Sequence, residues 1–167
     1  MFNADYTNEW CDLTRTIADG EHHMLQLSHD YEQFKRTPLR KGLFLAFQPD
    51  GTVGYAQDDN AVFAGVLKMW DPHFGNDTLN PMDLLLGFDV EMCALKTSIS
   101  RLFTLRYDPE SLWLADVYCA VLLTKDGTVR SELTKDPLVL HRSIGRVVRP
   151  PLLPHDPYLV LSLRGWG

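Results

Sequence analysis

The sequence predicts a mainly β fold, a compact barrel-like or sandwich-like body that contains two related hairpin units. The stretch Asp-Gly-Thr-Val occurs at residues 50–53 and again at residues 126–129, and each copy follows an apolar run that is typical of a strand. Residues 98–107 alternate in period two, as a half-buried strand does. Four prolines directly follow an aspartate between apolar runs, where turns are expected. Together these signals indicate a β meander.

Each Asp-Gly pair is expected to form a two-residue hairpin turn, Asp50-Gly51 in the first unit and Asp126-Gly127 in the second. Such turns require positive φ, which this pair tolerates, and the β-branched Thr-Val pair suits the returning strand. Downstream, each copy reaches a glycine inside an apolar run, Gly65 and Gly145, which predicts a bulge or a close backbone approach. We therefore expect an internal repeat at about residues 41–70 and 116–149.

The chain is expected to form one domain with an N-terminal extension. Its 167 residues, 45% of them hydrophobic, suit a single body with its own core. Residues 1–40 are polar and acidic, which predicts an arm, either extended or with a short amphipathic helix before Pro38, ahead of a body at 41–167. Within the body, residues 149–154 should form a stiff extended connector and residues 158–163 a final strand.

The distribution of charge bears on the possible partners. A formal net charge of -6 argues against nucleic acid and against an anionic membrane surface as partners. Residues 1–32 hold seven acids and one arginine, whereas residues 142–164 hold four arginines and one aspartate. The acidic segment could therefore lie on this basic region in the same or a neighbouring subunit. The alternative is two separate solvated faces, because exposed ion pairs contribute little.

No local signature of catalysis is present, so we expect no enzyme and no cofactor. The three cysteines are widely spaced, which predicts reduced, buried residues. Glu21, His22, His23 and His29 come nearest to a metal cluster, but adjacent histidines on a strand point to opposite faces, so no metal site is expected. His141 is expected to be a half-buried strand histidine, and residues 58–60 a polar turn.

Several aromatic residues outside the core patterns indicate an interface. Some lie in the polar arm, others flank the loop at residues 71–81, and one is next to last in the sequence. The alternative is that these rings fold back onto their own barrel. With two arginines of the basic region, the candidate interface consists of Phe2, Tyr6, Trp10, Trp70, Phe74, Arg146, Arg149 and Trp166.

Residues 40–67, with the sequence RKGLFLAFQPDGTVGYAQDDNAVFAGVL, resemble the structural cement, or capsid decoration, proteins of tailed bacteriophages. In that family the chain enters through a glycine and an apolar strand, turns at Asp-Gly, returns through small residues and ends in a Gly-Val strand. The second copy, which ends at residues 144–148, is similar. The resemblance covers about half of the chain and leaves the arm and the middle segment uncovered.

The resemblance implies a homotrimeric virion protein without cofactor on the outer surface of the capsid. Its partner would be the major capsid protein, and it would stabilise the assembled shell by bridging neighbouring coat subunits. The arm could then add a strand to a neighbour, with Phe2, Tyr6 and Trp10 as anchors. The alternative function is a β-rich carbohydrate-binding or tail-associated module without catalysis.

Overall fold

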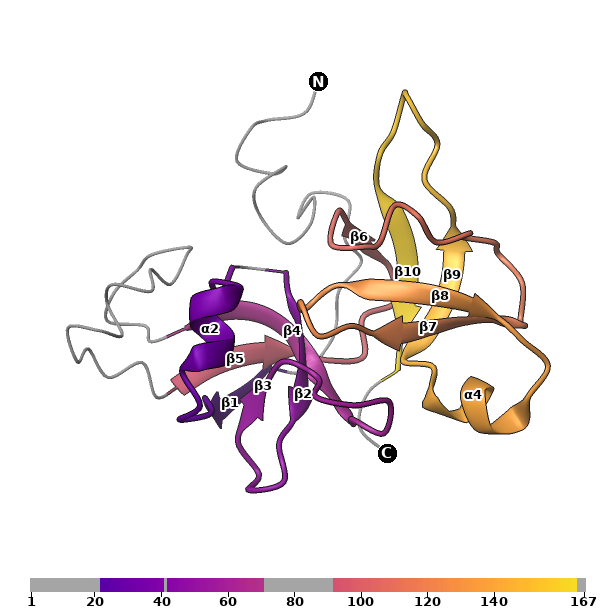
Figure 1. Ribbon diagram of the computed structural model, residues 1–167. Coiled ribbons are helices and arrows are strands. Elements are labelled where there is room, and N and C mark those ends of the chain that lie inside the picture. Colours follow the sequence, from indigo (N-terminus) through magenta and orange to yellow (C-terminus); the bar gives the residue numbers. More distant parts are fainter. Residues whose placement is uncertain (1–21, 41, 71–91, 165–167) are drawn as a thin grey trace.

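The computed structural model describes residues 22–40, 42–70 and 92–164 (Figure 1). Within these residues the chain is mainly β, as predicted. The first unit contains β1 (His22–Gln26), α2 (Glu32–Arg36), β2 (Phe44–Phe47), β3 (Val53–Gly54), β4 (Phe63–Trp70) and β5 (Met92–Lys96). The second contains β6 (Leu102–Thr104), β7 (Cys119–Leu123), β8 (Val129–Leu133), α4 (Pro137–Arg142), β9 (Gly145–Arg149) and β10 (Leu159–Leu163).

The first unit is one curled antiparallel sheet with strand order β1-β5-β4-β2-β3. Its two edges meet, because Leu27, just after β1, forms a parallel bridge with Val53 in β3. The backbone N–H of Ser28 donates to the carbonyl of Val53 at 2.9 Å. The concave side encloses a core that includes the fully buried side chains of Phe34 and Tyr55. The curl thus satisfies backbone groups that a flat sheet would leave unpaired at its edges.

The second unit repeats this circuit with two smaller sheets, β6-β10-β9 and β7-β8. They are joined where the N–H of Ile144 donates to the carbonyl of Val121 at 2.9 Å. On the other side, Tyr107 bridges Val129 in parallel, and the N–H of Asp108 donates to Val129 at 2.8 Å. The circuit β6-β10-β9-β7-β8 is therefore the counterpart of β1-β5-β4-β2-β3. Val53 and Val129, the last residues of the two Asp-Gly-Thr-Val copies, close it at the same point.

The two strand glycines also occupy equivalent positions. Gly65 lies opposite Leu45, where the register of β2 and β4 shifts, and a Cβ at Gly65 would lie 3.1 Å from the carbonyl oxygen of Lys96 in β5. A Cβ at Gly145 would collide with the carbonyl oxygen of Ser162 in β10. The predicted close backbone approach is therefore confirmed at both glycines. The two equivalent units are larger than the repeat predicted at residues 41–70 and 116–149, because the equivalent sheets also include β1 and β5 in the first unit and β6 and β10 in the second.

The prediction of two-residue turns was wrong, because both hairpins have three-residue loops. The N–H of Gln48 donates to the carbonyl of Thr52 at 2.7 Å, and that of Thr124 donates to Thr128 at 3.1 Å. Within each turn only the glycine has positive φ, 86° at Gly51 and 78° at Gly127. Such loops combine an ordinary turn with one left-handed residue, so the aspartates Asp50 and Asp126 need no unusual backbone conformation.

In the first turn Asp50 acts through its side chain. Its Oδ1 accepts hydrogen bonds from the hydroxyl of Thr52 at 2.6 Å and from the N–H of the same residue at 3.0 Å. These two bonds, the hydroxyl first, lower the pKa of Asp50 below its ordinary value. In the second turn the hydroxyl oxygen of Thr124 takes this role, since it accepts from the N–H of Thr128 at 3.3 Å and lies 2.9 Å from the hydroxyl of Thr128. The two turns therefore share a backbone shape and differ in the side chain that supports it.

Three local expectations differ from the structure. Residues 22–40, assigned to the arm, belong to the body, since β1 pairs along its length with β5 and Leu39 is fully buried. The strand expected over residues 98–107 is shorter, because only β6 is a strand there, and Ser98 has a φ of 54°, which no strand residue adopts. His141 lies exposed on α4, since Asp136 accepts a hydrogen bond from the N–H of Leu138 and begins a helix at Pro137.

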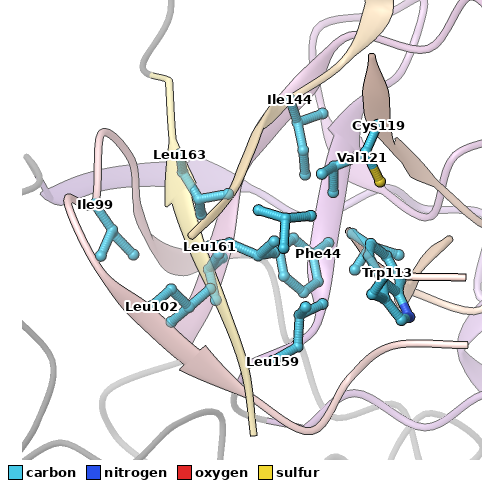
Figure 2. Close-up of a cluster of buried hydrophobic side chains, with 13 residues drawn as sticks. Phe44, Ile99, Leu102, Trp113, Cys119, Val121, Ile144, Leu159, Leu161 and Leu163 are labelled. Atoms are coloured by element: carbon cyan, nitrogen blue, oxygen red, sulfur yellow. The ribbon is translucent and has the colours of Figure 1, made fainter. Parts of the chain in front are cut away.

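A shared core joins the two units, which lie side by side in Figure 1. Phe44, Val66 and half-buried Phe63 of the first unit pack into a cluster whose other members come from the second unit or, in the case of Ile99, from the connection between the units. Figure 2 shows Phe44 among Leu159, Leu161 and Trp113. The backbone also crosses between the units, because the N–H of Phe44 donates to the carbonyl of Gly127 at 2.7 Å. The second hairpin turn is therefore part of the contact between the units.

Candidate binding surfaces

The connection between β9 and β10 forms a projecting hairpin, at the top of Figure 1. Leu152 and Leu153 at its tip are 48% and 70% exposed, and we call these two residues the hairpin tip. The N–H of Leu152 donates to the carbonyl of Asp156 at 2.8 Å, and the N–H of Asp156 donates back at 2.9 Å. The segment therefore turns back on itself instead of forming the extended connector that the sequence predicted.

Arg149 fixes the base of this hairpin. Its guanidinium donates to Oδ2 of Asp156 at 2.8 Å and to the carbonyl of Tyr158 at 3.1 Å, and it lies 6.0 Å from the ring centroid of Phe103. The hydroxyl of Tyr107 adds a hydrogen bond to the carbonyl of Pro157 at 2.6 Å. The two leucines are thus presented on a segment whose conformation is already set, so little conformational entropy remains to be lost on binding.

A second exposed apolar surface lies around the loop before β7. Trp113 is buried there, its ring packed edge-on against Tyr107 and its Nε1–H donating to the carbonyl of Asp108 at 3.1 Å. This anchor turns the neighbouring leucines outward. The loop also lies on β8, because the hydroxyl of Ser131 donates to the carbonyl of Leu112. The surface, here called the apolar face, consists of Leu112, Leu114, Val117, Tyr118 and Leu133, each at least 40% exposed.

A hollow with arginines at its rim adjoins the apolar face at Val117. Arg146 on β9 and Arg164 after β10 are both exposed. Ser143 is buried in it, donates its hydroxyl hydrogen to the carbonyl of Gly145 at 2.7 Å and accepts from the N–H of Val121 at 2.9 Å. We call this region the basic hollow; its lining is Val117, Cys119, Leu140, Ser143, Gly145, Arg146 and Arg164. It combines an apolar floor with two cations.

A smaller hollow lies between the two units and has charges of both signs. Arg130 and Arg142 line it together with the turn residues Asp58 and Asp59. Arg142 reaches across the units to the carbonyl of Asp59 at 3.3 Å. The polar turn expected at residues 58–60 is present, with the N–H of Asn60 donating to Asp58 at 2.8 Å. Because the charges of this hollow offset one another, it is a contact between the units and offers little to an anion or a cation.

The predicted interface residues fall into three groups. Phe2, Tyr6, Trp10, Phe74 and Trp166, together with the side chain of Trp70, lie outside the described residues. Arg146 is exposed at the basic hollow, whereas Arg149 is half-buried and paired with Asp156. The leucines of the apolar face and the hairpin tip were missed. In the sequence, these residues stand out only as large apolar side chains next to the aspartates and prolines of turns. Buried residues occur in the same pattern, so it does not indicate exposure.

The described part of the chain has no grouping of three or more His, Cys, Asp or Glu side chains placed to hold a metal ion. Glu21 lies outside that part and the side chain of His22 is not described, while Nε2 of His29 lies 3.2 Å from the amide nitrogen of Gln26. Cys93 and Cys119 are buried free thiols, and burial raises the pKa of Cys93 to about 12. Neither described helix is long and apolar enough to cross a membrane.

Comparisons of the chain with models of known protein families, with curated proteins and with solved structures gave no match.

Proposed function

We propose that this protein is a capsid decoration protein that lies on the outer surface of a tailed-bacteriophage capsid and bridges neighbouring subunits of the major capsid protein. The observation that carries the proposal is the pair of exposed apolar surfaces on the second unit, the hairpin tip and the apolar face. Each offers large aliphatic or aromatic side chains to water, and their burial against a partner would contribute about 25 cal/mol per Å². Contiguous exposed apolar groups favour protein contact sites, whereas single exposed apolar residues are common on any protein surface.

The arrangement of the two surfaces favours bridging. The hairpin tip and the loop that carries the apolar face belong to different parts of the second unit and are held by separate contacts, one through Arg149 and the other through Trp113. A molecule with two separate contact surfaces can engage two neighbouring subunits at once, and the second contact then forms at a high effective concentration. Dispersed coat subunits offer only one contact at a time, so the assembled shell is bound and stabilised preferentially.

The resemblance to cement proteins adds the class of partner. Residues 40–67 form β2, the three-residue turn, β3 and the first part of β4, which is the order of elements that the resemblance implies. The second copy forms β7, its turn, β8 and β9 in the same order, with α4 inserted before β9. On this proposal the protein acts as a homotrimer, with the paired units as its body and the two apolar surfaces as its contacts with the shell.

Co-sedimentation with shells that lack the protein tests the proposal. We expect saturable binding to assembled shells and much weaker binding to dispersed coat subunits. The double variants Leu152→Ser/Leu153→Ser and Leu112→Ser/Leu133→Ser should each weaken binding. Val62→Ser provides the matched control, because Val62 is 63% exposed but lies on the first unit, just before β4. Equal binding by all variants, or no binding to any shell, would exclude the proposed contacts.

A further inference from the structure

We infer that the basic hollow is the docking site of the chain's own acidic N-terminal segment, residues 1–21. The inference is independent of the capsid proposal, because it concerns a contact within one polypeptide. It rests on the composition of the hollow and of the segment, and on the tether between them.

The hollow fits a ligand that carries both negative charge and large apolar groups. Arg146 and Arg164 are exposed at its rim, and no described acid forms a salt bridge with either. Asp116 lies next to Val117 in sequence, but its Oδ1 accepts the N–H of Tyr118 at 2.9 Å within its own turn. The floor is apolar, with Leu140 from α4 and the exposed side chain of Val117 at its edge. A purely polar anion would leave that floor uncovered.

Residues 1–21 have the matching composition. They contain five acids, Asp5, Glu9, Asp12, Asp19 and Glu21, and one arginine, Arg15, a net charge of -4. The same residues hold large apolar side chains at a repeated spacing of three to four, namely Phe2, Tyr6, Trp10, Leu13 and Ile17. Acidic and apolar side chains thus alternate over a short stretch. This combination complements a hollow with an apolar floor and a cationic rim. The other described hollow, at Arg130 and Arg142, fits it less well, because that hollow has aspartates of its own.

The tether favours a contact within the same chain. Residues 1–21 lead directly into β1, whose first residue is His22. An extended chain spans about 3.3 Å per residue, so this segment can reach roughly 70 Å from β1. Tethering to the same chain also gives an effective concentration of about millimolar, which no second copy reaches in dilute solution. Weak charge pairs and a few apolar contacts are then sufficient to hold the segment in place.

Photo-cross-linking of the full chain tests the inference. Trp10→p-benzoylphenylalanine should cross-link to peptides that contain Val117, Leu140, Arg146 or Arg164. In an equal mixture of light and heavy isotope-labelled protein, the cross-linked pairs should carry a single isotope label. Arg146→Glu/Arg164→Glu should lower the yield by about tenfold, because two attractions become repulsions. Adding Asp5→Lys/Glu9→Lys/Asp12→Lys should restore it, which a merely misfolded variant would not allow.

The matched control is Arg36→Glu/Lys125→Glu, two exposed cations on α2 and in the second hairpin turn, which should leave the yield unchanged. Three outcomes would overturn the inference. Pairs of mixed isotope label would assign the hollow to the segment of a second copy. Cross-links at other surfaces would assign the segment elsewhere. An equal loss of yield in the control variant would mean that the net charge of the protein, and not the basic hollow, determines the cross-linking yield.

Discussion

Replacing Gly127 by alanine should destabilise the protein by about 2–5 kcal/mol, whereas Gly51→Ala should cost only about 1–2 kcal/mol. Both glycines occupy the left-handed position of equivalent three-residue turns, with φ of 78° and 86°. The backbone strain of an added Cβ, about 1–2 kcal/mol, is therefore common to both. The surroundings differ, since a Cβ at Gly51 meets nothing within 4 Å, while one at Gly127 would lie 2.7 Å from Cε1 of Tyr55.

Tyr55 cannot easily move away from the new methyl group. Its side chain is fully buried, and its hydroxyl donates to the carbonyl of Thr37 at 2.6 Å. A methyl group forced into such a packed site costs about 1–3 kcal/mol beyond the backbone strain. Gly127 would also shift relative to Phe44, whose N–H it accepts at 2.7 Å across the two units. The excess cost therefore measures the contact between the units.

Urea unfolding followed by circular dichroism measures both free energies of unfolding. Gly51→Ala is the internal control, because it carries the same substitution at the same backbone conformation. Equal losses in the two variants would refute the reasoning, since they would mean that the second hairpin turn does not pack against Tyr55. A second transition in Gly127→Ala alone would indicate that the units had separated while each stayed folded.

Three further predictions concern stability. Gln33→Leu should cost about 1–3 kcal/mol, because Oε1 of Gln33 is the acceptor of the buried N–H of Tyr55 at 2.8 Å. Thermal unfolding measures this, with the same substitution at exposed Gln26 as the control, and equal midpoints of the two variants would contradict it. Arg149→Met removes the ion pair with Asp156 and should loosen the hairpin tip, so the backbone amides of Leu152 and Asp156 should exchange hydrogen with solvent faster than in the parent protein. Unchanged exchange rates would show that this ion pair is not needed to hold the hairpin. Burial raises the pKa of Cys93 from 9.0 to about 12, so the protonated thiol stabilises the fold fully below pH 9, and this contribution is lost as the pH rises toward 12. The free energy of unfolding should therefore fall less over this pH range in Cys93→Ala than in the parent protein. An identical fall in both proteins would be evidence against this assignment.

Local patterns predicted the parts of the fold that depend on nearby residues. The glycines Gly51, Gly127, Gly65 and Gly145 all occupy positions that only glycine fills without strain or collision, and the residue type alone indicated this. The loop length of the turns was missed, because it depends on which residues pair across the hairpin. β1 was also missed, since its partner β5 lies far along the chain and its polar residues give no strand pattern.

The exposed apolar surfaces were harder to predict for the same reason. Trp113 and Leu112 are adjacent and both large and apolar, yet Trp113 is 6% exposed and Leu112 is 60% exposed. Only the packing of Trp113 under Tyr107 decides which of them points outward. Similarly, Arg146 and Arg149 lie three residues apart on one strand, but only Arg149 has Asp156 beside it. Exposure of a large side chain is a property of the tertiary contacts, which a single sequence does not specify.

On the proposed function, the protein stabilises an assembled shell by bridging its subunits. The most direct test is the temperature at which tailed-phage shells that bind the protein release their contents, measured with and without the purified protein at saturating occupancy. The proposal predicts a higher release temperature for decorated particles, and a smaller rise with the Leu152→Ser/Leu153→Ser variant at equal occupancy. An unchanged release temperature on fully decorated particles would contradict it.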